Sequence, residues 1–236
     1  MQIEVLFPEL CNLFGDSGNI RYLEKCLPDA QFINTSLNDT PAFVSGEPDM
    51  IYMGSCTEKN QEKIIRRLMP YKDTLKAMIE QGKVMLFTGN APEIFYKYIE
   101  KDDGSKVECL GLFDLYAEQR LFKRFNSLVL ADYDGREIVG FKTQFTQIYG
   151  DNSKNFLAKV ERGSGINESS DLEGVHVNNF FATSLVGPLL VMNPYFTEHI
   201  MGLLGVRDPV CAFREHSLKA YNDRIIDFRT CKCVTE

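Results

Sequence analysis

The first half of the chain alternates short apolar runs with longer segments in which apolar residues recur at helical spacing. Short apolar runs bounded by turn-forming residues are typical of buried strands, and spacings of three and four residues are typical of helices. We expect strands at 2–7, 31–34, 50–53 and 84–87, and helices at 20–27 and 57–81. This alternation of strand and helix indicates a parallel sheet that is covered by helices on both faces.

The longest helical segment, 57–81, contains Pro70 in its interior. Proline lacks the backbone N–H that a helix interior requires, so we expect two helices or a kink at this point. Gly82 follows the segment and suits a helix end, because glycine adopts the left-handed backbone found there without strain.

The second half has a different pattern, with apolar stretches separated by turn-rich segments. These stretches predict strands at 120–130, 137–143 and 175–182. The pattern favours antiparallel strands added to the parallel core.

A last helix is predicted at 194–204. Asn193 is a suitable N-cap for it, and Pro194 suits the first helical position. We expect one domain over residues 1–207, followed by a C-terminal extension or tail over residues 208–236.

Composition narrows the class of protein. The chain has 236 residues, of which 44% are hydrophobic and 25% charged, values that are ordinary for a globular protein. A net charge of −7 disfavours non-specific binding to nucleic acid or to an anionic membrane. The N-terminus does not read as a secretion signal and no apolar run approaches the length of a membrane span, so we expect a cytoplasmic protein.

The seven cysteines do not predict a metal site. No CxxC pair occurs, and the one close pair is Cys231 and Cys233. Two sulfurs alone do not complete the four-ligand site that structural zinc requires. We expect reduced thiols and neither a metal nor a cofactor.

Three turns that follow predicted strands are candidate sites, because ligands of open α/β sheets bind at the carboxyl ends of strands. They lie within 6–20, 53–61 and 84–95. The last, VMLFTGNAPEIF, has the strand–turn–helix layout in which α/β enzymes display a nucleophile. The residue at its apex is Thr88, whose hydroxyl needs a neighbouring base to become a nucleophile.

Five segments resemble, in order, the motifs of a known family. LFPELCNLFGDSGNI resembles the family motif LYPDLMNxYGDxGN. GSCTEKNQ is found where the family has GGGQDxEQ, and FTGNAPEIF is found where it has the elbow CGGYQLLG. GFKTQFTQIY resembles GFENHxGRTY, and residues 163–194 resemble GxGNN…EGVxxxNxxGTYLHGPLLPxNP. The family is the class I glutamine amidotransferases of the cobyric acid synthase (CobB/CobQ) type. Within it the resemblance is to the GatD type, the glutaminase subunits of lipid II isoglutaminyl synthase, and it extends from about residue 4 to about residue 205.

This resemblance implies a flavodoxin-like class I glutamine amidotransferase fold, a mostly parallel sheet flanked by helices with added antiparallel strands. In the family, the elbow cysteine attacks the side-chain amide of glutamine and a histidine of the TYLHGP segment moves protons. Backbone N–H groups beside the elbow and in the glycine loop stabilise the oxyanion. Ammonia then passes to a synthetase, which implies a Mur-ligase-like (MurT-type) partner here.

The matching positions of this chain lack the catalytic groups. The cysteine position holds Thr88, the histidine position holds Val186, and the histidine of the GFENH motif is replaced by Gln144. Valine takes no proton, and a β-branched residue is disfavoured at the positive φ of a nucleophile elbow. We expect Thr88 and Val186 to be catalytically inactive.

Other residues leave two hypotheses open. Gly54 and Gly89 offer backbone N–H groups, and Arg124 and Gln144 are candidate binding residues for glutamine or a related small ligand. Cys56 is a candidate replacement nucleophile, because a thiol at a helix N-terminus can have a lowered pKa. The chain is therefore either a catalytically impaired subunit that binds a ligand or a partner, or an active amidohydrolase or amidotransferase with rewired chemistry at Cys56.

Overall fold

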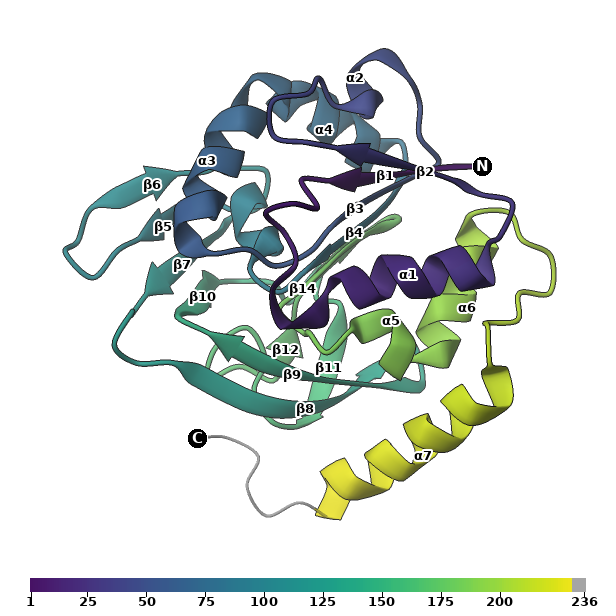
Figure 1. Cartoon of the computed structure of the whole chain (residues 1–236). Coiled ribbons are helices and arrows are strands. Elements are labelled where there is room, and N and C mark those ends of the chain that lie inside the picture. Colours follow the sequence, from purple (N-terminus) through teal and green to yellow (C-terminus); the bar gives the residue numbers. More distant parts are fainter. Residues whose placement is uncertain (231–236) are drawn as a thin grey trace.

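The computed structural model describes residues 1–230, so Cys231 and Cys233 lie outside the described residues. A six-stranded central sheet has helices on both faces, and two four-stranded sheets lie beside it (Figure 1). The strand order of the central sheet is β13-β14-β4-β3-β1-β2, and every pairing is parallel except that of β13 with β14. Its strands are β1 (Gln2–Leu6), β2 (Gln31–Thr35), β3 (Met50–Met53), β4 (Val84–Thr88), β13 (Val175–Val177) and β14 (Phe180–Thr183).

The two smaller sheets come from the middle of the chain. One has the order β10-β7-β5-β6, and the other, entirely antiparallel, has the order β12-β11-β8-β9. The first consists of β5 (Tyr98–Glu100), β6 (Lys106–Glu108), β7 (Leu115–Gln119) and β10 (Thr146–Gly150). The second consists of β8 (Phe125–Tyr133), β9 (Arg136–Gln144), β11 (Ala158–Arg162) and β12 (Leu172–Glu173).

The helices connect the strands of the central sheet and cover them. The α-helices are α1 (Ser17–Cys26), α2 (Ala42–Ser45), α3 (Glu58–Leu68), α4 (Lys72–Glu80), α5 (Leu189–Met192), α6 (Pro194–Leu203) and α7 (Arg214–Thr230). Short 3-10 turns are η1 (Leu13–Gly15), η2 (Met69–Tyr71) and η3 (Ala91–Phe95).

The buried strands of the central sheet divide their side chains between two apolar cores. In β3, Ile51 and Met53 face the core shared with α3 and α4, whereas Met50 and Tyr52 face the core shared with α1, α5 and α6. Successive side chains of a strand point to opposite faces, so a strand that is apolar throughout needs a cover on each side. This arrangement fixes the carboxyl ends of β3, β4 and β14 at one edge of the sheet.

Most of the predicted first half is confirmed. The strands at β1 to β4 and the helix α1 lie where the apolar pattern indicated them. The segment at 57–81 is divided at Pro70, which lies in η2 between α3 and α4. Gly82 has a φ of +75°, the left-handed conformation expected after a helix.

Two predicted strands of the second half were wrong in their bounds. The expected strand at 120–130 begins only at Phe125, because residues 120–124 form the turn between β7 and β8. The expected strand at 175–182 is two strands, since the chain reverses at Asn178, which has a φ of +53°. The second of them, β14, joins the central sheet parallel to β4.

Asn193 does not cap α6 with its side chain. Its amide instead accepts a hydrogen bond from the N–H of Val139 at 2.8 Å and donates to the carbonyl of Val139 at 2.8 Å. The residue therefore ties the start of α6 to β9, and Pro194 does occupy the first helical position as predicted.

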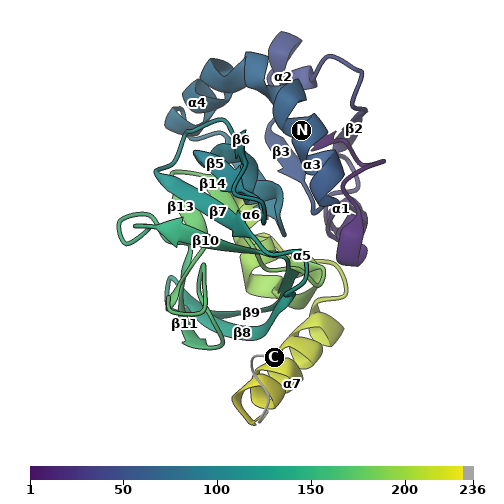
Figure 2. The same cartoon turned by 90° about the vertical axis from the view of Figure 1, so that its left-hand side faces the viewer.

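The expected C-terminal extension contains the helix α7, which lies beside β8 and β9 (Figure 2). Tyr221 and Ile225 are its buried residues, and the Tyr221 hydroxyl donates to the carbonyl of Glu137 at 2.7 Å. Among residues 1–230, no helix combines the length and the apolar character that crossing a membrane demands.

A buried ion pair joins the antiparallel sheet to the end of β14. Lys142 and Glu173 are both fully buried, and the Lys142 ammonium donates to the Glu173 carboxylate and to the carbonyl of Gly165. The other oxygen of Glu173 accepts from the Thr183 hydroxyl and from the N–H of Ser184, each at 2.8 Å. This contact fixes the segment that follows β14.

Replacing Lys142 by methionine should lower the free energy of unfolding by about 3–5 kcal/mol, because it leaves the Glu173 carboxylate buried without a counter-charge. Urea denaturation measures the change. The matched control is Lys123→Met, which breaks the exposed pair with Glu168 and should cost less than about 1 kcal/mol. Equal effects of the two substitutions would contradict the assigned role of the buried pair.

Candidate functional site

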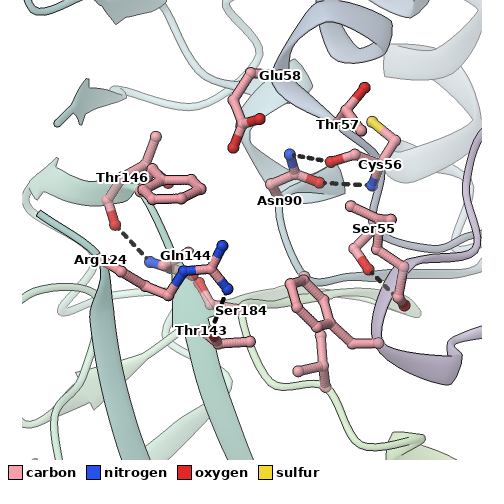
Figure 3. Close-up of a pocket in the computed structure, with 15 residues that line it drawn as sticks. Ser55, Cys56, Thr57, Glu58, Asn90, Arg124, Thr143, Gln144, Thr146 and Ser184 are labelled. Carbon is pink, nitrogen blue, oxygen red and sulfur yellow. Dashed lines mark hydrogen bonds between the residues drawn. The ribbon is translucent and has the colours of Figure 1, made fainter. Parts of the chain in front are cut away.

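A cavity of about 200 Å³ lies at the carboxyl ends of the central strands (Figure 3). Its walls come from η1, the segment that follows β3, the elbow after β4, the β9–β10 segment and the segment after β14. Arg124, at the end of the turn before β8, completes the lining. The position agrees with the site expected from parallel α/β topology.

Thr88 ends β4 but does not line this cavity. Its side chain is fully buried, and its hydroxyl donates to Asp16 Oδ2 at 3.0 Å and lies 3.3 Å from the Tyr52 hydroxyl. The positive φ of the elbow, +66°, belongs to Gly89, the next residue. The elbow therefore directs the Thr88 hydroxyl under the turn and not into the cavity.

Asp16 is the acceptor at the centre of a polar cluster beneath the cavity. The same Oδ2 that binds Thr88 accepts from the N–H of Ser55 at 2.8 Å and from its hydroxyl at 2.9 Å. Tyr52 donates to the carbonyl oxygen of Asp16 at 3.0 Å, and Asn19 donates to the Tyr52 hydroxyl at 3.0 Å. Burial raises the pKa of Asp16, and the hydrogen bonds from Ser55 and Thr88 oppose this rise.

Asp16 lies in the first candidate turn, within 6–20, but was not singled out from the sequence. A signal was present, because the GDSGN segment is part of the opening motif that carries the family resemblance. What the reading lacked was the burial of Asp16, which depends on contacts with β3 and β4, 36 residues or more away in the chain.

Asn90, in the elbow after β4, binds through its side chain to the glycine loop that follows β3. Its carboxamide accepts from the N–H of Cys56 at 3.0 Å and donates to the carbonyl of Cys56 at 2.9 Å (Figure 3). Since the N–H of Ser55 is bound to Asp16, two consecutive loop amides already have acceptors within the chain. These amides are the kind of donor that an oxyanion hole requires to be free for the substrate.

The two candidate glycines have packing roles. Gly54 does not line the cavity, and a Cβ there would lie 2.9 Å from the Cβ of Asp16. Gly89 does line it, and a Cβ there would lie 2.4 Å from the Cβ of Ser55. Glycine is thus required at position 54 by the close approach of Asp16, and at position 89 by the close approach of the loop and the elbow.

Cys56 contributes to the cavity lining, but its thiol faces the core. The residue is buried, and the pKa of the neighbouring Cys11 is raised by a hydrogen bond with Cys56 and by burial. In Figure 3 the Cys56 sulfur points away from Arg124. A thiol directed at another thiol in an apolar core lacks the electropositive surroundings that favour a thiolate.

Val186, which the resemblance matches to the family histidine, lines the cavity. Its backbone pairs with Phe141, with the Val186 N–H donating to the carbonyl of Phe141 at 3.0 Å. The structure thus holds the segment in place and presents an aliphatic side chain there.

None of the three histidines lines the cavity. The ring of His176 stacks on Phe181 with centroids 4.5 Å apart, and His199 Nε2 lies 3.2 Å from the hydroxyl of Tyr133. Burial lowers the pKa of both imidazoles. His216 is exposed on α7, so no imidazole is placed to act as a base at the elbow.

Two opposite charges face the cavity. The Arg124 guanidinium donates to the Thr143 hydroxyl at 3.1 Å and lies 4.4 Å from the ring centroid of Phe145. The carboxylate of Glu58, in the first turn of α3, lies on the other side of the same space (Figure 3). Gln144, the other candidate binding side chain, also lines the cavity, and its amide donates to the carbonyl of Thr146 at 2.7 Å.

Within residues 1–230, no group of three or more histidine, cysteine, aspartate or glutamate side chains is arranged to hold a metal ion.

Glu58, Asn90 and Thr143 were not singled out from the sequence. Each lies on a different segment, so only the fold brings them to one cavity.

Glu93 connects the cavity walls from below. It is buried in η3 and accepts from Gln61 Nε2 at 2.8 Å and from the hydroxyl of Thr146. The same Gln61 nitrogen donates to the carbonyl of Asn90 at 2.7 Å. Burial raises the pKa of Glu93 to about 7, although the hydrogen bonds from Thr146 and Gln61 oppose the rise.

Comparison with known proteins places the sequence among amidotransferase relatives. Residues 2–193 match the model of the CobB/CobQ-like glutamine amidotransferase domain. The lipid II isoglutaminyl synthase (glutamine-hydrolyzing) subunit GatD of Staphylococcus aureus (strain N315) is 28% identical over 192 residues, which are 80% of this chain and 78% of that protein. GatD of Streptococcus pneumoniae (strain ATCC BAA-255 / R6) is 27% identical over 199 residues, 82% of this chain and 76% of that protein.

Solved structures confirm the predicted fold class. PurLQS from Thermotoga maritima superposes with a TM-score of 0.53 over 95% of this chain and 98% of that chain, at 11% identity. A second structure, of a glutamine amidotransferase, gives a TM-score of 0.54 over 86% of this chain and 99% of that chain, at 13% identity. At these identities the likeness concerns the flavodoxin-like class I fold alone.

Glu93 should make stability depend on pH in a defined direction. Its folded-state pKa of about 7 exceeds the ordinary 4.5, so its stabilising contribution is complete below pH 4.5 and is lost as the pH rises through about 7. The loss corresponds to about 3 kcal/mol. Urea denaturation from pH 4.5 to 8 measures the free energies of unfolding of the native chain and of Glu93→Gln. As the pH rises over this range, the native chain should lose about this amount of stability relative to the variant. Parallel pH profiles would contradict the assignment.

Proposed function

Because the chain belongs to the family of CobB/CobQ-like glutamine amidotransferase domains, we propose that it is a member without glutamine hydrolysis, acting as a ligand-binding or partner-binding subunit. The observation that carries this proposal is the position of the Thr88 hydroxyl, which is bonded to the buried Asp16 and lies outside the cavity. A nucleophile must reach the substrate carbonyl, and this hydroxyl does not.

The remaining parts of the family mechanism are also missing, which supports the same proposal. Val186 and the remote histidines leave the cavity without the imidazole base that the family mechanism uses. The loop amides of Ser55 and Cys56 are bonded to Asp16 and Asn90. Nucleophile, base and oxyanion donors act together in acyl transfer, so the loss of all three accounts for a centre that binds without reacting.

The cavity suits a small zwitterionic ligand, for which we propose glutamine or a related amino acid. Its volume of about 200 Å³ is below the roughly 300 Å³ at which pockets for larger ligands begin. Arg124 can bind a carboxylate through two parallel hydrogen bonds, and Glu58 can accept from an ammonium group. Gln144 and Thr143 border the same space.

The partner that we propose is a Mur-ligase-like synthetase of the MurT type. Both GatD relatives are described as subunits of a lipid II isoglutaminyl synthase. This chain would bind the synthetase as a subunit with a ligand in its cavity, and it would not hydrolyse glutamine.

The competing function is an amidotransferase that uses Cys56. The orientation of its thiol toward Cys11 and the absence of a histidine from the cavity lining count against it. A reactive Cys56 would have to turn its thiol out of the core, and no histidine lines the cavity to act as its base.

The purified chain should release no ammonia or glutamate from glutamine, with or without the synthetase. The Thr88 hydroxyl lies outside the cavity, the Cys56 thiol faces the core, and no histidine lines the cavity to activate either. A coupled glutamate assay measures this, with Cys56→Ala as the paired variant. Turnover that disappears in Cys56→Ala would replace the proposal with the rewired enzyme. Turnover that persists in this variant and disappears in Thr88→Val would assign catalysis to the elbow after all.

Arg124→Ala should weaken the binding of L-glutamine roughly tenfold or more, since a charge-assisted hydrogen bond contributes about 1.5–3 kcal/mol. Isothermal titration calorimetry measures the affinity. Arg120→Ala is the matched control, because Arg120 belongs to the same turn but does not line the cavity. Equal affinities of both variants, or no binding by the native chain, would contradict the proposed ligand.

A further inference from the structure

The turn between β7 and β8, residues 120–124, carries the most exposed aromatic side chain in the described part of the molecule. Phe122 is fully exposed, with a relative accessibility of 102%, and its neighbour Leu121 is 46% exposed. Single exposed apolar residues are common on protein surfaces, but an adjacent Leu-Phe pair at the tip of a turn is a typical anchor for a partner.

Hydrogen bonds from backbone N–H groups of the turn hold it in place. The N–H of Arg120 donates to the carbonyl of Phe145 at 2.6 Å, and the N–H of Lys123 donates to the carbonyl of Arg120 at 3.0 Å. The N–H of Leu121 donates to the Asp102 carboxylate at 2.8 Å. A turn with these bonds projects Phe122 without needing to be ordered on binding, which reduces the entropic cost of association.

The same turn reaches the cavity. Arg124, two residues after Phe122, lines it and lies over Phe145. Phe14 lines it as well, is 40% exposed, and has a φ of +57°, which is strained for a bulky residue. Arg124 of the turn and Phe14 of η1 therefore border the same cavity, and Phe122 is two residues from Arg124 in the chain.

Charge favours an acidic partner. The turn contains three cations, Arg120, Lys123 and Arg124, on a chain whose net charge is −7. Arg120 pairs with Glu118 and Lys123 with Glu168, but both pairs are at the surface, where such contacts are weak and easily exchanged. Among the described residues, no carboxylate forms an ion pair with Arg124.

We propose that residues 120–124 together with Phe14 form a docking surface for a protein whose own surface has an apolar depression bordered by carboxylates. Phe122 enters the depression, the three cations face the carboxylates, and the docked protein covers the cavity. The inference rests on the proposed function and deepens it, because it assigns the surface that the synthetase contacts when it covers the empty or ligand-bound cavity.

The cations of the turn do not favour a membrane as the occupant. The turn supplies three cations, and its tip offers two apolar side chains. Stable membrane attachment needs a larger apolar face or a polybasic cluster.

The test measures the affinity of the purified chain for the purified Mur-ligase-like synthetase of the same genome by biolayer interferometry. Phe122→Ala should weaken binding at least tenfold, as expected for a central aromatic anchor. Phe213→Ala is the matched control, because Phe213 is also highly exposed but precedes α7, at the opposite edge of the molecule in Figure 1. It should leave the affinity within twofold of the native value. Circular dichroism verifies that each variant is folded.

Each other result decides against the inference. Native-like affinity of Phe122→Ala overturns the docking surface and leaves the synthetase as partner. No binding by the native chain or by either variant overturns the partner half of the proposed function together with the docking surface. Sedimentation of the native chain, but not of Phe122→Ala, with vesicles of phosphatidylcholine and phosphatidylglycerol overturns it in favour of a membrane.

Discussion

The buried carboxylate of Asp16 is the interaction on which the arrangement of the site depends. One of its oxygens accepts from the backbone and side chain of Ser55 and from Thr88. The start of α1, the loop after β3 and the end of β4 are therefore bound to one atom. A carboxylate removed from water is costly unless it is fully hydrogen-bonded, so the three segments are held together by the need to satisfy it. The cavity above them takes its floor from this cluster, and the elbow keeps its shape without displaying a reactive group.

The sequence predicted those parts of the fold that follow from local pattern. Residues 50–53 and 84–87 form unbroken apolar runs, and Pro70 and Gly82 mark a break and an end that backbone chemistry imposes. The pattern was less informative where neighbouring strands share composition. The reversal at Asn178 separates two apolar strands without a glycine or a proline, and the turn at 120–124 contains leucine and phenylalanine, which the pattern assigned to a strand.

The candidate site was also predicted only in part from the sequence. The substitutions at Thr88 and Val186 were visible because the motifs around them are preserved, and Arg124 and Gln144 do line the cavity. The use of the loop amides by Asp16 and Asn90 was not visible. Hydrogen bonds between segments 34 or more residues apart depend on the register of the sheet, which a single sequence does not reveal. The direction of the Cys56 thiol depends on its packing against Cys11, and this too required the fold.

The Lys142–Glu173 pair restricts how segments can be exchanged between this chain and its relatives. In the motif that GFKTQFTQIY resembles, an acidic residue stands at the position of Lys142, whereas Glu173 belongs to a segment that resembles the EGV motif. A chimera that received only the β9 segment of such a relative would bury two carboxylates where this chain buries an ion pair. Two like charges in that space would force one to be protonated or the segment to open. In this chain Glu173 therefore depends on Lys142 for its counter-charge, although the two residues are 31 positions apart in the chain and neither lines the cavity.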